Sequence, residues 1–209
     1  MTTLSRMTTL APTASTIADR IVSRSRVSDI ALVTAGVALV ALLARVEVPM
    51  WPVPISGQTL AVLLVGATLG AKRAAASMTT YMLVGLAGAP VFAGGAGGPA
   101  YLLAPSFGFI LGFIPAAAFI GWLAQRTWDR TPLLALVGFL GASLIPFAVG
   151  VPYLGFMLAR LGMAHDPLTL WTVGVAPFLV GGVVKWLIAA SVLPLAWRGV
   201  RAWESRTRA

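Results

Sequence analysis

Six long apolar runs dominate this chain of 209 residues and restrict what it can fold into. Five of them reach the roughly 17 to 25 residues that a helix needs to cross a bilayer. With 58% of its residues apolar and 10% charged, the chain has too little polar surface to coat a soluble globule. The sequence therefore predicts an all-α integral membrane protein of the cell membrane. The runs cover residues 30–48, 58–71, 74–91, 101–124, 133–159 and 170–197.

The distribution of positive charge predicts the topology. If all six runs cross, twelve of the fifteen Lys and Arg residues lie on one side of the bilayer. The exceptions are Arg45 and Arg160 on the other side and Lys185 inside the sixth run. This bias follows the positive-inside rule and places both termini in the cytoplasm. The second run has only 14 residues, so its crossing is predicted from charge rather than from length.

The chain divides into one membrane domain and two short tails. The expected boundaries are a flexible cytoplasmic tail over 1–28, a six-helix membrane domain over 29–198 and a basic cytoplasmic tail over 199–209. The first tail has no early apolar core followed by a cleavage site, so no removed signal peptide is expected. Cysteine is absent, which excludes disulfides and thiolate metal sites.

Several function classes lack the residues they need. The net charge of +9 flanks membrane helices rather than forming a soluble basic face, so we expect no nucleic-acid partner. His165 is the single histidine, which leaves little to build a metal site. Ser143, in Gly141-Ala142-Ser143, has no membrane histidine to activate it, and no GxxxxGK[ST] loop occurs. We expect no catalysis, no ATP hydrolysis and no cofactor on this chain.

Lys185 is the first candidate for ligand binding. A lysine inside hydrocarbon costs at least about 2.5 to 3.5 kcal/mol near a helix centre, and it usually faces the bundle interior with a partner. All six acidic residues lie in tails or loops, so an anionic or strongly accepting ligand is a reasonable counter-group. The alternative is that the side chain extends to the outside interface.

A charge-free, glycine-rich segment lies outside between the third and fourth runs. Its glycines can take left-handed conformations and let amide groups approach a ligand, and its aromatic residues suit a neutral ring with polar edges. The alternative is a plain flexible turn. The candidate ligand contacts here are Phe92, Gly94, Gly95, Gly97, Gly98 and Tyr101.

The loop between the first two runs supplies further candidates. Three prolines stiffen residues 49–54, and Trp51 either covers a pocket or anchors the chain at the interface. Gln58 and Thr59 offer donors and acceptors where the second run begins.

Four stretches of the sequence resemble the BioY family, the biotin-specific S components of energy-coupling factor (ECF) transporters. They are VPISGQTLAVL at 53–63, GAKR at 70–73, GAPVFAGGAGG at 88–98 and PSFGFILGF at 105–113. The PVFAGG-x-GG block is the most specific. The resemblance runs in order over about 30–197, nearly the whole membrane domain.

The resemblance implies an S-component fold of six transmembrane helices. Biotin would be captured outside, under the loops that join helices 1 and 2 and helices 3 and 4, and delivered inward. The implied partners are an ECF transmembrane coupling subunit and two ATPases, which hydrolyse the ATP. Small residues one turn apart allow close helix contact, so Ala31, Ala35 and Ala38 form the candidate docking face. The alternative for that face is ordinary internal packing.

The sequence departs from the family pattern in the sixth run. The family carries an Asp three residues before the Lys, and Gly182 stands at that position here. An accepting group such as Gln58 or a backbone carbonyl then replaces the carboxylate, or the affinity or ligand differs. The alternatives are an S component for another small vitamin and a membrane interaction protein that has lost ligand binding.

Overall fold

The computed structural model describes residues 16–207 and is mostly helical. Its one sheet in that part of the chain is a short antiparallel pair, in which Glu47 faces Ser56 and Val48 faces Ile55. The elements are α1 (Ile17–Ile21), α2 (Arg26–Ala44), β1 (Glu47–Val48), β2 (Ile55–Ser56), α3 (Gln58–Leu69), α4 (Ala71–Leu86), η1 (Ala93–Gly95), η2 (Pro99–Leu103), α5 (Phe107–Ala124), η3 (Trp128–Arg130), α6 (Pro132–Arg160), α7 (Pro167–Gly174) and α8 (Ala176–Thr207).

Four stretches are long and apolar enough to cross a membrane. They are α2, α5, α6 and the stretch Pro167–Arg206, which contains α7 and most of α8. The prediction of a multi-pass, all-helical membrane protein agrees with this finding. The 12-residue helix α3 is apolar but shorter, as the second run suggested.

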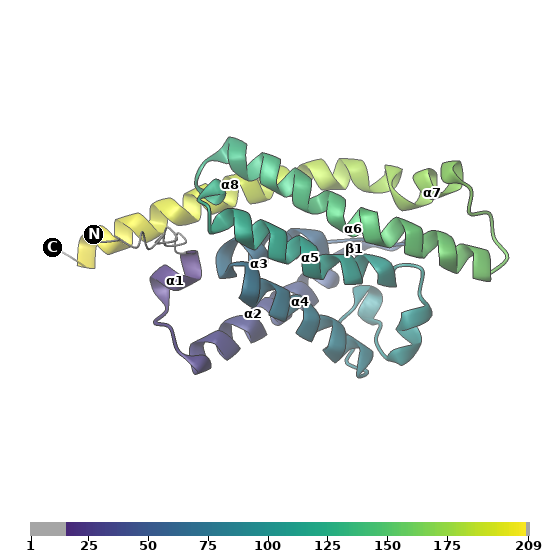
Figure 1. The fold of residues 1–209 in the computed structure, drawn as a ribbon, viewed down its shortest axis with the longest axis horizontal. Helices are drawn as coiled ribbons and strands as arrows, with labels where there is room; N and C mark the ends of the chain where they lie inside the picture. Colours follow the sequence, from purple (N-terminus) through teal and green to yellow (C-terminus); the bar gives the residue numbers. More distant parts are fainter. Residues whose placement is uncertain (1–15, 208–209) are drawn as a thin grey trace, which may run out of the picture.

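Helix α5 forms the centre of the bundle. In Figure 1 it runs between α2 and α4 on one side and α6 and α8 on the other. Glycines let it pack closely: a Cβ added at Gly112 would lie 2.6 Å from the Cα of Pro146, and one at Gly121 would lie 2.5 Å from the backbone N of Ala71. Such small residues allow close helix contact in membranes, where dispersion rather than water exclusion drives packing.

The sixth apolar run is not one helix. It is interrupted at Val175, whose φ of −129° and ψ of −58° separate α7 from α8. Pro177 contributes to the break, because proline has no N–H to donate to the carbonyl of Val173, four residues earlier. The start of α8 is thereby placed beside the loops that precede α3.

The first residues that the structure describes do not form the expected flexible tail. From Thr16 onward the chain is ordered, and Thr16 and Asp19 form a capping box around α1. Ile17 and Ala18 are buried in the core, so the expected boundary at residue 28 is too late. Residues 1–15 of the expected tail lie outside the described residues.

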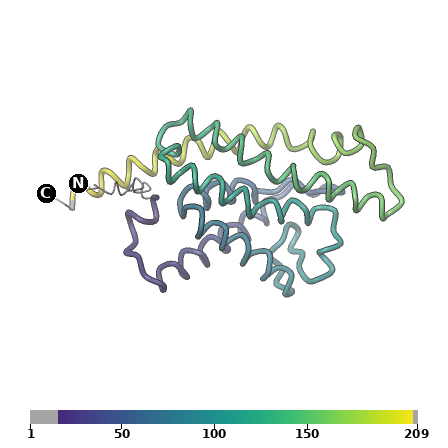
Figure 2. The backbone as a smooth tube through the Cα atoms, viewed as in Figure 1, coloured from purple at the N-terminus to yellow at the C-terminus, as the bar shows by residue number. Residues whose placement is uncertain are grey.

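The residues of the expected C-terminal tail are also part of the helical bundle. Helix α8 runs without interruption to Thr207, and Val200, two residues into the expected tail, is buried. Glu204 pairs with Arg20 of α1 at 3.3 Å between the charged atoms. In Figure 2, α1 and the end of α8 accordingly lie at one end of the bundle, and the η1 and η2 loops lie at the other.

Candidate functional site

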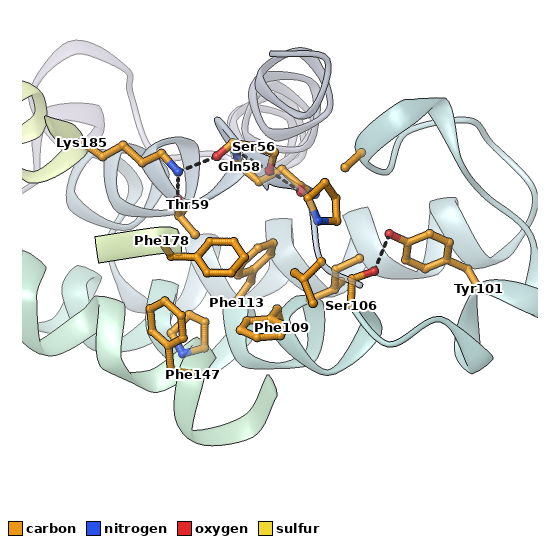
Figure 3. Close-up of a pocket in the computed structure, with 15 residues that line it drawn as sticks. Ser56, Gln58, Thr59, Tyr101, Ser106, Phe109, Phe113, Phe147, Phe178 and Lys185 are labelled. Carbon is orange, nitrogen blue, oxygen red and sulfur yellow. Dashed lines mark hydrogen bonds between the residues drawn. The ribbon is translucent and has the colours of Figure 1, made fainter. Parts of the chain in front are cut away.

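A cavity lies at the loop end of the bundle, where both predicted binding loops meet α5, α6 and α8. It holds about 530 Å³ of space free of atoms, including its open mouth. Figure 3 shows its wall, which combines aromatic side chains with a few polar groups. The lining residues are Val53, Pro54, Ser56, Gln58, Thr59, Ala93, Tyr101, Ser106, Phe109, Ile110, Phe113, Pro146, Phe147, Phe178 and Lys185.

Lys185 reaches this cavity from α8. Its Nζ donates to the carbonyl oxygen of Ser56 at 2.6 Å and to Oγ1 of Thr59 at 2.9 Å. Both acceptors are neutral, and no acidic side chain within residues 16–207 forms a salt bridge with this lysine. Lys185 therefore has only neutral acceptors at the edge of a mostly apolar cavity (Figure 3).

Gln58 is fixed by hydrogen bonds on both sides of its amide. Ser56 Oγ donates to Gln58 Oε1 at 2.7 Å, and Gln58 Nε2 donates to the hydroxyl of Tyr81 at 2.6 Å. Tyr81 in turn donates to the carbonyl of Val91 at 2.9 Å. This chain of bonds joins the first binding loop to the second, and it leaves Gln58 Oε1 with a further lone pair for a ligand.

The short β pair positions Ser56 at the cavity. Ser56 ends β2 opposite Glu47 of β1, and the N–H of Gly57 donates to the carbonyl of Val46 at 2.8 Å. The backbone that accepts from Lys185 is therefore part of a hydrogen-bonded ribbon rather than a free loop.

Four phenylalanines form the apolar wall of the cavity. Phe109 and Phe147 meet edge to face with ring centroids 5.8 Å apart, and Phe178 stacks on Phe109 at 6.1 Å. Phe113 completes the wall from α5. None of the four is predicted from the sequence as a ligand contact, because a phenylalanine in an apolar run has the same pattern whether it faces a ligand or lipid. Only the packing of the helices shows whether a given phenylalanine faces a ligand or lipid.

Tyr101 lines the cavity, as predicted, and shares a hydrogen bond of 3.0 Å with the hydroxyl of Ser106. Burial raises the pKa of Tyr101, so its hydroxyl stays protonated. Phe92 lies behind it, fully buried, with ring centroids 4.5 Å apart. Phe92 therefore supports the wall and does not line the cavity.

The predicted glycines shape the second loop without lining the cavity. Gly94, Gly95 and Gly98 have φ of 68°, 72° and 95°, which side chains rarely adopt. Gly97 packs so closely that an added Cβ would lie 2.3 Å from the carbonyl oxygen of Ala89. Ala93 is the residue of this segment that reaches the cavity.

Trp51 does not line the cavity. Its side chain is 59% exposed, and its neighbours Val53 and Pro54 form the wall instead. In the membrane protein this position suits an interfacial anchor, which was the alternative for Trp51.

The alanine face of α2 points away from the bundle. Ala31, Ala35 and Ala38 are exposed, whereas Gly36 and Val40 of the same helix are buried. The internal-packing alternative is therefore wrong, and the face is open to lipid or to another protein.

No group of three or more metal-ligating side chains gathers within residues 16–207.

Comparison with known proteins gives consistent matches. The sequence model described as the BioY family matches residues 12–202. The biotin transporter BioY of Rhodobacter capsulatus is 36% identical over 148 residues, which cover 67% of this chain and 76% of that protein. That of Thermotoga maritima is 35% identical over 163 residues, covering 77% and 92%. The probable biotin transporter BioY of Pyrococcus horikoshii is 34% identical over 173 residues, covering 83% and 96%.

A solved structure shares the fold. The crystal structure of the S-component for biotin from an ECF-type ABC transporter aligns with a TM-score of 0.68, covering 84% of this chain and 95% of that chain, at 21% sequence identity. The predicted S-component fold is therefore confirmed at the level of architecture.

Proposed function

The chain belongs to the BioY family, and from this premise we propose that it captures biotin outside the cell and delivers it inward. Its relatives are transporters, and the chain is a multi-pass membrane transport protein rather than an enzyme. In a bacterium, its place is the plasma membrane.

The cavity at the loop end is the observation that carries this proposal. Biotin is a fused, sulfur-containing ring with a ureido group, and it needs apolar contacts with a few donors and acceptors at the ring edge. The four phenylalanines offer the apolar contacts. The Gln58 amide and the hydroxyls of Ser56, Ser106 and Tyr101 offer the polar ones, and Gln58 Oε1 serves as the acceptor that Gly182 does not provide.

The charge distribution supports a specific orientation. We infer six crossings, with both termini and α1 in the cytoplasm and the cavity near the outer surface. Arg73, at the start of α4, pairs with Asp19 and Asp29 at the same end as the pair between Arg20 and Glu204. Helix α1 and the end of α8 then pack together on the cytoplasmic side of the bundle.

Transport requires an energy source that this chain does not contain. We infer that an ECF transmembrane coupling subunit and two ATPases supply it, with ATP bound by those partners. The exposed face of Ala31, Ala35 and Ala38 is suited to close contact with a helix of the coupling subunit.

The test is labelled-biotin binding to the detergent-purified protein, comparing wild type with Lys185→Ala. We expect the variant to lose at least about tenfold in affinity, because a charged donor beside the cavity is removed. Lys72→Ala is the matched control, since Lys72 is the other lysine and lies exposed in the first turn of α4, beyond the far end of α3. Folded wild-type protein that binds no biotin would contradict the proposal.

A further inference from the structure

The last turns of α8 leave the bundle at the end opposite the cavity. In Figure 1 they extend beyond α5 and α6, towards the C-terminus. With 32 residues, α8 is about 48 Å long, whereas the hydrocarbon core of a bilayer is about 30 Å thick. The sequence carries no charge from Trp186 to Trp197, and charge returns at Arg198. Part of α8 therefore extends outside the hydrocarbon.

The contacts of Trp197 show where the hydrocarbon ends. Its indole Nε1 donates to the carboxylate of Asp129, in the η3 turn between α5 and α6. The guanidinium of Arg130, in the same turn, lies 4.5 Å from the centroid of the Trp197 ring. Charged groups are costly inside hydrocarbon, and tryptophan is typical of the membrane interface. Arg198 and Arg201, which follow Trp197, therefore lie at the level of the lipid headgroups.

Arg198 and Arg201 share an open face of α8. Trp197 and Val200 are buried against the bundle, whereas the two arginines are exposed. Residues three apart on a helix have Cβ atoms about 5 to 6 Å apart, so the two guanidinium groups are neighbours. Like charges at this spacing disfavour the helix, and an anion bound between them removes the repulsion.

Neither arginine is neutralised within the part of the chain that the structure describes. Among residues 16–207, neither Arg198 nor Arg201 forms a salt bridge. The helix dipole does not account for them either, because its attraction for cations is confined to the last turn, where Arg206 lies. The acidic residues Asp19, Asp29 and Glu204 pair instead with Arg20, Arg24 and Arg73.

We propose that Arg198 and Arg201 bind the headgroup phosphate of an anionic phospholipid in the cytoplasmic leaflet. This inference rests on the proposed function, whose orientation places this end of the bundle in the cytoplasm. The planar guanidinium matches a phosphate with two parallel hydrogen bonds, and basic clusters directly after a transmembrane helix attract anionic lipids. The sequence adds Arg206 and Arg208 to this cluster, the latter beyond the described residues.

The surface of α8 also offers a contact for the acyl chains of such a lipid. Leu195, one turn before Arg198, is 58% exposed and lies on the membrane side of the arginine pair. A lipid bound here holds the end of α8 at the membrane surface. Helix α1 is held there with it, because Ile17 packs in the same core cluster as Trp197 and Val200.

Native mass spectrometry of the detergent-purified full chain, titrated with phosphatidylglycerol or phosphatidylcholine, tests the proposal. We expect wild type to prefer phosphatidylglycerol. Arg198→Gln and Arg201→Gln should each weaken its binding about fivefold and leave phosphatidylcholine unchanged. Arg198→Lys keeps the charge and should keep most of the preference. Equal binding of the two lipids by wild type would overturn the proposal.

Arg160→Gln is the matched control. Arg160 is also an exposed arginine near the end of a transmembrane helix, but it ends α6 at the opposite end of the bundle. Its replacement should leave the preference for phosphatidylglycerol as in wild type. An equal loss in Arg160→Gln and Arg198→Gln would show that net charge alone attracts the lipid, and would overturn the assignment to the pair.

Inorganic phosphate separates a lipid site from a site for any phosphate. At constant ionic strength it should not displace phosphatidylglycerol, because it lacks the acyl chains that contact Leu195. Displacement to the level of the Arg198→Gln variant would overturn the assignment to a lipid.

The outcomes also separate this inference from the proposed function. Wild type that binds biotin and shows no preference for phosphatidylglycerol overturns this inference alone. Wild type that prefers phosphatidylglycerol and binds no biotin refutes the proposed function alone. Labelling of Ser205→Cys from outside intact cells would place the arginine pair in the outer leaflet and overturn the assignment to the cytoplasmic one.

Discussion

Gly97 shows how a single residue controls the shape of the second binding loop. An added Cβ would lie 2.3 Å from the carbonyl oxygen of Ala89 and 2.9 Å from its carbonyl carbon, and neither backbone atom can rotate away. The next residue, Gly98, donates its N–H to the carbonyl of Gly85 at 2.7 Å, so the loop has little freedom to shift.

We therefore expect Gly97→Ala to displace the loop that carries Ala93 and Tyr101 and to reduce biotin affinity by about tenfold or more. Titration calorimetry of the purified variant measures this loss. Gly199→Ala, in open space on α8, should bind as wild type does. Unchanged affinity in Gly97→Ala would show that the loop is not part of the site.

The sequence predicted the polar residues of the site better than the apolar ones. Lys185, Gln58 and Thr59 are conspicuous because a polar side chain in an apolar run is costly unless it has a partner or a role. Phe178 carries no such signal, since lipid and a ligand cavity have similar polarity. Trp51 was predicted as a possible lid and is exposed instead, because the direction of a loop side chain depends on packing that the sequence does not show.

At the scale of elements, Arg45 joins the two loops at the cavity end of the bundle. Its Nη2 donates to the carbonyl of Pro90 at 2.5 Å, and its Nη1 would lie 2.7 Å from a Cβ added at Gly95. Arg45 precedes the β pair that positions Ser56, so this contact connects the second loop to a ligand-facing residue of the first.

We expect Arg45→Ala to let the loops separate more often and to raise the dissociation rate of biotin by about two- to tenfold, as expected for one solvent-accessible hydrogen bond. Stopped-flow release of labelled biotin measures it. Arg160→Ala is the control, because Arg160 is also exposed but ends α6 and lies over the ring of Phe156, 5.7 Å from its centroid. Identical release rates for Arg45→Ala and wild type would show that Arg45 does not hold the two loops together.

Helix α1 is held to the bundle by the carboxylate of Asp19. Partial burial alone would raise the pKa of this group, but hydrogen bonds from Arg24, Thr16 and Arg73 outweigh it and lower the pKa to about 2. Arg73 Nη1 lies 2.9 Å from Asp19 Oδ1. Because the folded-state pKa is depressed, the charged form stabilises the docked helix above about pH 4, and this stabilisation is lost as the pH falls towards 2.

Hydrogen exchange of the amides at 17–22 should therefore accelerate about tenfold between pH 5 and pH 3 after correction for intrinsic rates. Asp19→Asn should exchange fast at pH 5 and show little further change. Exchange in wild type that stays constant across this range would show that Asp19 does not hold α1.

The bounds of helices were predicted correctly where the local hydrophobicity of the sequence determines them. The start of α3 at Gln58 and the end of α5 at Ala124 match the predicted runs. Helix α1 was missed because five residues are too few to be stable without tertiary contacts, which the sequence does not display. The break at Val175 was hidden because α7 and α8 are both apolar and only Pro177 marks their junction.

At the scale of the whole molecule, the short helix α3 explains where the cavity lies. Twelve residues form a helix about 18 Å long, whereas the hydrocarbon core is about 30 Å thick. If the end of α3 at Leu69 reaches the cytoplasmic surface, its start at Gln58 lies within the outer half of the membrane. The β pair before it then reaches below the outer surface, where Ser56 and Gln58 meet Lys185.

This arrangement requires α3 to cross, and the cysteine-free sequence allows a direct test. Single cysteines at exposed positions can be probed in intact cells with a membrane-impermeant maleimide. We expect Met163→Cys, between α6 and α7, to react from outside, and Ser205→Cys, near the end of α8, to react only after permeabilisation. Lys72→Cys tests whether α3 crosses the membrane, because this residue lies just beyond the end of α3. It should behave like Ser205→Cys. Labelling of Lys72→Cys in intact cells would mean that α3 and α4 enter and leave on the same side, and that the bundle has four crossings instead of six.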